Sequence, residues 1–124
     1  MAKILIIDDE KPIREALSAL AIAAGHEPLC AADGRQGMAK FASFQPDLVI
    51  TDILMPEQEG VETINELRKL SPDLPIIAIS GGGRAGSMSF LKIAERFGAN
   101  RTIAKPFAAS VIMAAFNDLL PKPV

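Results

Sequence analysis

Two apolar runs in this sequence each lead directly into carboxylate side chains. Ile4-Leu5-Ile6-Ile7 precedes Asp8-Asp9-Glu10, and Leu48-Val49-Ile50-Thr51 precedes Asp52. Such runs are typical of strands buried on both faces of a parallel sheet, and ligands bind at the carboxyl ends of those strands. If the two strands are neighbours, three carboxylates share one pocket.

Clustered carboxylates require positive charge, because two unit charges about 4 Å apart interact by roughly 4 kcal/mol at an effective dielectric constant of ~20. A divalent cation or shared protons would relieve the repulsion, and ligands made only of oxygen suit Mg²⁺. A carboxylate in such a pocket can also attack phosphorus and form an aspartyl phosphate, while a metal ion and a lysine neutralise the transferring oxygens.

Two further residues at the ends of strand-like runs fit this chemistry. Lys105 follows Arg101–Ala104 and would supply positive charge, and Ser80 ends Pro75–Ser80 and would donate a hydrogen bond to a phosphoryl oxygen. Each residue alone has a simpler interpretation, such as a solvated lysine or a turn serine. Asp8-Asp9-Glu10 alone could equally be a strand-ending turn that stabilises the next helix. Their joint placement at strand ends favours the chemical interpretation.

The elements that would position these residues alternate between short apolar runs and helical patterns. We expect strands at Lys3–Asp8, Glu27–Ala32, Asp47–Asp52, Pro75–Ser80 and Arg101–Ala104. The first helix opens at Pro12 and closes at Gly25, with a stripe of Ile13, Ala16, Leu17, Leu20, Ala21 and Ala24 facing inward. The inward positions predicted for the other four helices are Met38, Phe41 and Ala42; Val61, Ile64, Leu67 and Leu70; Phe90, Leu91, Ala94 and Phe97; and Val111, Ile112, Ala115, Phe116 and Leu119.

Five strand-helix units of this kind predict an α/β fold with helices on both faces of one parallel sheet. Right-handed crossovers favour a doubly wound, flavodoxin-like sheet with strand order 2-1-3-4-5 and a pocket above the first and third strands. The 124 residues, 49% of them hydrophobic and 23% charged, suffice for one domain, expected over residues 1–124 with no output domain.

Charge, cysteine content and hydropathy leave several classes of partner and location without support. The formal charge of -2, with no basic run, gives no footprint for nucleic acid or an anionic membrane. Cys30 has no partner for an internal disulfide and is expected to be a small core residue, and His26 is expected to lie in a surface turn. No apolar run resembles a signal peptide or reaches transmembrane length. We therefore expect a cytoplasmic protein.

The ordered motifs resemble those of bacterial two-component response regulator receiver domains, in particular single-domain regulators of the chemotaxis type. The matching blocks are Ile6–Glu10, Asp52–Pro56 with Gly60, Ser80, Gly98-Ala99 and Lys105–Phe107. They cover nearly the whole chain, and five blocks in register are far more specific than any one of them.

That resemblance implies a role for each candidate residue. Asp52 would accept the phosphoryl group, Ser80 and Lys105 would bind its oxygens, and Lys105-Pro106 would be a cis peptide bond. Asp8, Asp9, Asp52 and the backbone carbonyl of Leu54 would hold Mg²⁺. The implied partners are a histidine kinase or histidine phosphotransfer protein and an unidentified downstream protein, and the implied state is a monomer.

Two features depart from this pattern or compete with it. Thr102 stands where the family commonly carries an aromatic residue, so the usual aromatic switch is absent. The loop Gly81-x-Gly83-x-x-Gly86 formally matches a dinucleotide fingerprint, but it follows the fourth strand and no acidic residue ends the next strand. Ser87 stands where a Walker motif requires lysine.

Three functions remain open at this point. The first is a phosphorylation-dependent signalling switch that is not an enzyme beyond its own phosphorylation and dephosphorylation. The second is a receiver-like scaffold that binds partners without phosphorylation. The third is a Mg²⁺-dependent phosphatase with an aspartate nucleophile, which is disfavoured because such enzymes carry Asp-x-Asp where this chain has Asp8-Asp9-Glu10.

Overall fold

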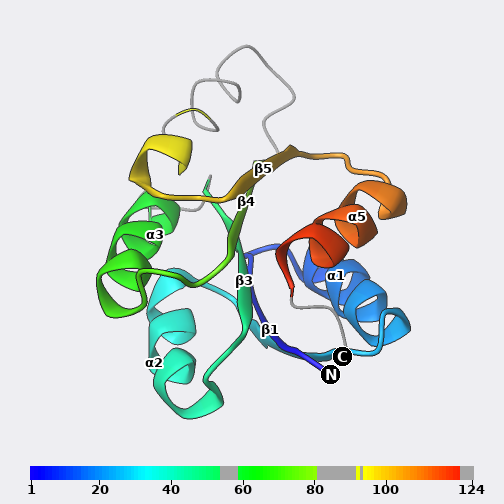
Figure 1. The fold of residues 1–124 in the computed structure, drawn as a ribbon, viewed down its shortest axis with the longest axis horizontal. Coiled ribbons are helices and arrows are strands. Elements are labelled where there is room, and N and C mark those ends of the chain that lie inside the picture. The colour runs from blue at the N-terminus through cyan, green and yellow to red at the C-terminus, as the bar shows by residue number, and fades with distance from the viewer. Residues whose placement is uncertain (54–58, 81–91, 93, 121–124) are drawn as a thin grey trace.

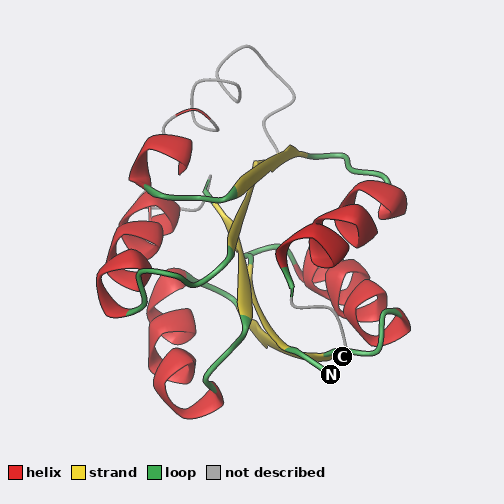
Figure 2. Ribbon diagram, viewed as in Figure 1, coloured by secondary structure: helices red, strands yellow, loops and turns green. Residues whose placement is uncertain are grey.

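Five parallel strands form one sheet in this computed structural model, which describes residues 1–53, 59–80, 92 and 94–120. The strands are β1 (Lys3–Ile7), β2 (Glu27–Ala31), β3 (Leu48–Asp52), β4 (Ile76–Ser80) and β5 (Arg101–Ala104). Their order is β2-β1-β3-β4-β5, which confirms the predicted fold. Figure 1 labels β1, β3, β4 and β5, and Figure 2 shows the strands between two layers of helices. Most strands are one residue shorter than predicted, a usual difference at element ends.

Helices cover both faces of the sheet. In Figure 1, α1 (Lys11–Ala23) and α5 (Ala109–Leu119) lie on one face, while α2 (Gly34–Phe44) and α3 (Glu59–Leu70) lie on the other. Both central strands β3 and β4 are buried along their whole length. The burial explains why their sequences are continuous apolar runs that do not alternate with polar residues.

Alternate residues of the strands supply two separate cores. Ile6, Ile50 and Ile79 pack towards α1 and α5. Ile7, Val49 and Ala78 pack towards α2 and α3. Because successive side chains of a strand point to opposite faces, Asp8 and Asp52 continue the rows of Ile6 and Ile50 just beyond the apolar core.

The inward faces of the helices are narrower than the sequence predicted. Ile64, Leu67, Ala94, Ile112 and Phe116 are buried as expected. The predicted inward residues that are instead exposed are Ala16, Ala42, Leu70, Phe97 and Val111. Leu70 and Val111 lie in end turns of their helices. Ala16 and Ala42 lie beside the buried residues of α1 and α2, whose buried stripes are too narrow to include them. Val61, Phe90 and Leu91 lie outside the described side chains, as does the glycine loop at 81–86.

Two residues on the α1 and β2 side differ in burial from the prediction. Cys30, expected in the core, is only half-buried because β2 is an edge strand. His26, expected as a surface turn residue, is half-buried and accepts a hydrogen bond at Nδ1 from the Ala2 amide, 3.1 Å away. Burial, followed by the nearby N-terminal charge, lowers the pKa of His26.

Candidate functional site

The site lies at the carboxyl edge of the sheet, where β1 and β3 are direct neighbours. Ile7 pairs with Thr51, so the next residues along the two strands, Asp8 and Asp52, end side by side. Asp8 is 0% exposed and Asp52 is 2% exposed. Two carboxylates at the edge of an apolar core cannot be left without compensating charge, because desolvation disfavours their ionised form.

Four carboxylates meet at this edge. Asp8, Asp9, Glu10 and Asp52 each offer one carboxylate oxygen, and these oxygens all lie within 4.8 Å of one another. The buried pair forms the floor and the exposed Asp9 and Glu10 form the rim. The predicted sharing of one pocket is therefore confirmed, and the set of hard oxygen donors fits a Mg²⁺ ion.

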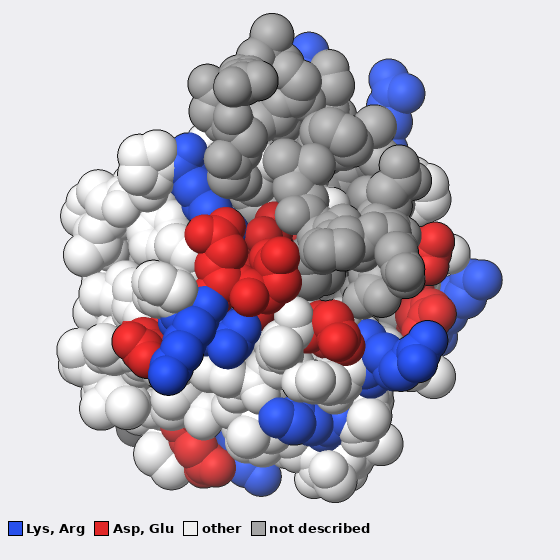
Figure 3. Space-filling model, turned by 180° about the vertical axis from the view of Figure 1, so that it is seen from behind, with Lys and Arg blue, Asp and Glu red and all other residues white. Residues whose placement is uncertain are grey.

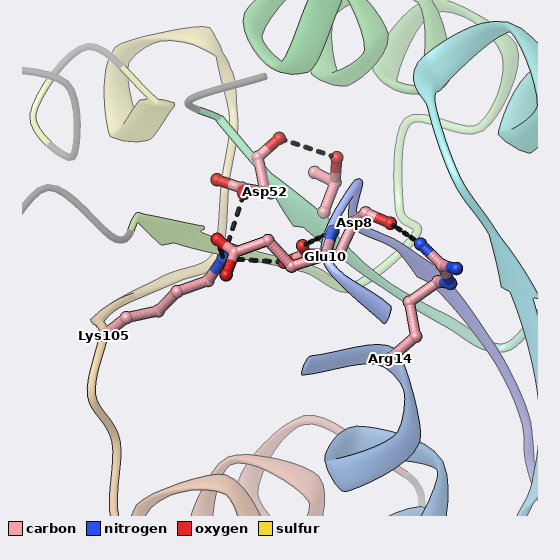
Figure 4. Close-up of polar contacts among 6 residues, drawn as sticks. Asp8, Glu10, Arg14, Asp52 and Lys105 are labelled. Carbon is pink, nitrogen blue, oxygen red and sulfur yellow. Dashed lines mark hydrogen bonds and ion pairs between the residues drawn. The ribbon is translucent and has the colours of Figure 1, made fainter. Parts of the chain in front are cut away.

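Lys105 reaches into this cluster from the residue after β5. Its Nζ lies 2.9 Å from Asp8 Oδ2, 3.0 Å from Asp52 Oδ2 and 3.3 Å from Glu10 Oε1 (Figure 4). Burial alone would lower the pKa of Lys105, but the contacts with Asp8 and Asp52 outweigh it and raise the pKa above its ordinary value. The lysine is therefore charged throughout the physiological range.

The backbone around Lys105 fixes the direction from which the side chain enters. The Lys105 amide donates a 2.7 Å hydrogen bond to the Ser80 carbonyl, which ties the end of β5 to the end of β4. The Lys105-Pro106 bond is cis, which confirms the prediction. The long side chain then crosses the end of β4 to reach carboxylates on β1 and β3.

Ser80 carries a buried hydroxyl with an open hydrogen-bonding capacity. The residue is 0% exposed, and its Oγ has no hydrogen-bond partner within the part of the chain that the structure describes. Buried hydroxyls are nearly always paired, so an unpaired one requires an explanation. Asp52 pairs with Ile79, which places Ser80 one residue beyond Asp52 on the adjacent strand. A ligand oxygen at this edge would satisfy the hydroxyl.

Contacts that the sequence did not predict hold the buried aspartates in place. The Glu10 amide donates to Asp8 Oδ1 at 2.8 Å, and Arg14 Nη1 donates to the Asp8 carbonyl at 2.8 Å. Thr51 Oγ1 donates to the Asp52 carbonyl at 3.2 Å. Arg14 lies one turn into α1, close in sequence to Asp8. This closeness was the only feature of the sequence that could have predicted the contact of Arg14 with Asp8. Leu54, whose carbonyl was predicted as a metal ligand, lies outside the described residues.

Asp9 and Glu10 of the carboxylate cluster are exposed and give the surface at the site negative charge. Figure 3 shows one face of the molecule, on which acidic side chains gather in the middle with basic side chains beside them. Two hollows lie elsewhere, and none of the four clustered carboxylates lines them. One of about 300 Å³ is lined by residues of α2 and α3, and one of about 440 Å³ is lined by residues of α1 and β2.

Across the described ranges, no helix is both long and apolar enough to cross a bilayer.

Comparison with known proteins adds independent information. A family profile described as the response regulator receiver domain matches residues 4–117. The chain is 34% identical over 118 residues to the chemotaxis protein CheY of Thermotoga maritima, covering 94% of this chain and 96% of that protein. It is 33% identical over 118 residues to the response regulator MprA of Mycolicibacterium vanbaalenii, covering 95% of this chain. There the chain spans only 50% of MprA, about half the length of that relative.

The fold comparison agrees. The crystal structure of a response regulator receiver domain protein from Clostridium thermocellum superposes with a TM-score of 0.87 at 31% sequence identity. The superposition covers 96% of this chain and 94% of the other. Sequence and structure therefore point to the same family across nearly the whole chain.

Proposed function

Because the chain belongs to the response regulator receiver domain family, we propose that it is a signalling switch in which Asp52 accepts a phosphoryl group. The donor is a histidine kinase or a histidine phosphotransfer protein. Phosphorylation then alters the affinity of the protein for a downstream protein target. The observation that carries this proposal is the contact of Lys105 Nζ with both buried carboxylates, at 2.9 and 3.0 Å.

Asp52 is the nucleophile of the proposed reaction. One of its carboxylate oxygens forms a bond to phosphorus while the bond between phosphorus and the donor's imidazole nitrogen breaks. The electron pair of the broken bond remains on that nitrogen. The product is an aspartyl phosphate, which stays labile because it is a mixed anhydride. The burial of Asp52 supports this role, since a desolvated carboxylate is held in one geometry.

Lys105 and Ser80 act on the phosphoryl oxygens. The ammonium group of Lys105 balances charge on the oxygens during transfer. The Ser80 hydroxyl, which lacks a hydrogen-bond partner within the described ranges, donates to a phosphoryl oxygen once the group is attached. Ser80 is thereby sensitive to whether Asp52 is phosphorylated.

A Mg²⁺ ion is the proposed cofactor, held by Asp8, Asp9 and Asp52 with the Leu54 carbonyl. When bound there, Mg²⁺ supplies positive charge that offsets the negative charge of the phosphoryl oxygens. The mutual approach of the carboxylate oxygens within 4.8 Å supports this assignment. The hydrogen bond from the Glu10 amide fixes Asp8 Oδ1, so Asp8 presents its other oxygen to the pocket.

We also propose that the protein is a cytoplasmic monomer. The formal charge of -2, with basic and acidic residues mixed, favours neither nucleic acid nor an anionic membrane as a partner. Self-phosphorylation and self-dephosphorylation are its only proposed chemistry. Thr102, half-buried on β5, is too small to act as the aromatic switch of relatives, so the output follows another route.

Mass spectrometry after treatment with acetyl phosphate and Mg²⁺ tests the proposal. The wild type gains one phosphoryl group that hydroxylamine removes, and Asp52→Asn gains none. Asp73→Asn, which removes an exposed carboxylate outside the cluster, serves as the matched control and is phosphorylated like the wild type. A protein that is never phosphorylated would support the scaffold function instead, and steady hydrolysis of phosphate esters would support a phosphatase.

A further inference from the structure

The contact between Glu10 and Lys105 is not explained by the roles assigned so far. Resting on the function proposed above, we propose that Glu10 is a releasable third partner of Lys105 and a positioning residue. It holds the ammonium group while Asp52 is unmodified and is displaced when a phosphoryl oxygen takes its place. Glu10 thereby sets how readily the site enters its phosphorylated state.

The number of donors on Lys105 carries the first step. An ammonium group has three N–H donors. Three carboxylates surround Nζ. It donates hydrogen bonds to Asp52 at 3.0 Å and to Glu10 at 3.3 Å, and Asp8 Oδ2 lies 2.9 Å away as an ion-pair partner. The phosphoryl oxygen that arrives on Asp52 therefore meets a lysine already surrounded by partners, and one of these contacts must be exchanged.

Solvent exposure decides which contact is exchanged. The side chain of Asp8 is 0% exposed, so water cannot compensate its charge if Lys105 leaves, and only the Mg²⁺ ion proposed above could do so. The side chain of Glu10 is 57% exposed, and its contact with Nζ is the longest of the three. Water can solvate the Glu10 carboxylate as soon as it leaves, so the release of Glu10 costs least.

The backbone of Glu10 allows its side chain to move alone. Its amide donates to Asp8 Oδ1 at 2.8 Å, and the residue caps the N-terminus of α1 without a hydrogen bond from its side chain. The main chain is therefore fixed while the carboxylate is free to swing outward. In addition, the negative charge of Glu10 repels an incoming phosphoryl group, because its oxygen lies in the same cluster as Asp52.

Glu10→Gln removes the negative charge of the side chain and keeps its shape. The glutamine amide competes only weakly for the Lys105 ammonium group and does not repel the phosphoryl oxygens. With Mg²⁺ saturating for each variant, we expect Glu10→Gln to bind the phosphoryl mimic beryllofluoride about two- to fivefold more tightly than wild type, the range of an exposed ion pair. Affinity for Mg²⁺ alone does not rise, because a nearby negative charge has been lost.

Backbone NMR titration is the suitable measurement, since the protein has no Trp or Tyr for fluorescence. Mg²⁺ is titrated first and beryllofluoride second, on wild type, Glu10→Gln and Glu15→Gln. Glu15 is the matched control because it lies on α1, is 67% exposed and contacts Lys11 at 3.9 Å. Glu15→Gln removes the same charge without touching Lys105. The affinity of this variant for beryllofluoride should stay within error of that of the wild type. Melting curves of the three proteins establish that all are folded.

Four outcomes contradict the inference, and each can be recognised from the titrations. If Glu10→Gln binds beryllofluoride no more tightly than Glu15→Gln, the contact with Lys105 does not control the site. If Glu10→Gln loses affinity for both Mg²⁺ and beryllofluoride, Glu10 is a metal ligand and not a releasable partner. If the wild type itself fails to bind beryllofluoride with Mg²⁺, or Asp52→Asn binds it equally well, the proposed function fails together with this inference.

Discussion

At the scale of single residues, the balance of charge around Lys105 governs the site. One ammonium group faces the carboxylates of Asp8, Glu10 and Asp52, and Asp9 belongs to the same cluster. The cluster therefore keeps an excess of negative charge even with the lysine in place. Like charges in one pocket raise the free energy of the folded state relative to the unfolded chain, in which these carboxylates are solvated.

Replacing Asp52 by asparagine therefore stabilises the metal-free protein. The introduced amide oxygen would still accept from Lys105 Nζ, which donates to Asp52 Oδ2 at 3.0 Å, while one repelling charge is removed. We expect Asp52→Asn to raise the free energy of unfolding by about 1 kcal/mol, equivalent to roughly 3–5 °C in Tm for a domain of this size. Thermal melts with a metal chelator provide the measurement.

Glu66→Gln is the control for this stability prediction, because Glu66 is exposed and lies outside the carboxylate cluster. Its Tm should match that of the wild type. A lower Tm for Asp52→Asn would mean that the attraction to Lys105 outweighs the repulsion among the carboxylates.

At the scale of elements, the site depends on strand ends, and a second network fixes the opposite end of the sheet. Arg68, in the last turn of α3, donates from Nη1 to the carbonyls of Pro72 and Leu74 at 2.8 and 2.7 Å. Its Nη2 donates to the Gly98 carbonyl at 2.6 Å and to Asn100 Oδ1 at 2.9 Å. One guanidinium group thus joins the segment before β4 to the segment before β5.

Glycine is required at position 98 for two reasons that this network explains. Gly98 has a φ of +114°, which other residues rarely adopt. A Cβ there would also lie 2.9 Å from Arg68 Nε, which is too close for a side chain. The Gly98-Ala99 block noted in the sequence therefore belongs to the support of β5 and not to the chemical site.

Arg68→Met should destabilise the protein by about 2–3 kcal/mol, because it leaves backbone carbonyls without donors while keeping most of the apolar stem. Lys69→Met is the matched control, since Lys69 is exposed and occupies the next position of α3. Its stability should change by less than about 0.5 kcal/mol. Urea unfolding of both variants measures the difference, and equal effects would contradict the role assigned to Arg68.

At the scale of the whole molecule, the site exists only in the folded chain. Asp8 and Asp52 are far apart in sequence, and the pairing of β1 with β3 brings them together. The unfolded chain offers no comparable cluster. A ligand of the pocket therefore binds the native state alone and stabilises the entire domain by mass action.

Mg²⁺ should raise the Tm of the wild type in a concentration-dependent manner. At a free concentration of 100 times Kd, the expected gain in unfolding free energy is about 2.7 kcal/mol. Asp8→Asn should lose most of this response, because Asp8 is a buried member of the cluster. NaCl at matched ionic strength controls for screening. A wild-type Tm that does not respond to Mg²⁺ would count against the proposed metal site.

The sequence by itself determined the architecture of this protein and most of its site. The apolar runs of β1, β3 and β4 are local features whose length and composition indicate buried parallel strands, and the strand order and the shared carboxylate pocket followed from them. The resemblance to a known family predicted the cis bond at Lys105-Pro106, which the structure confirms.

Only the tertiary structure decided the contacts between side chains that are distant in sequence. It placed Glu10 against Lys105, left the Ser80 hydroxyl without a described partner and exposed Val111. It also gave Arg68 its acceptors on two separate segments. Periodicity shows which face of an element is apolar, but distances of about 3 Å depend on strand register, on where each helix lies over the sheet and on the path of each loop. These are set by packing of the whole chain and have no local pattern.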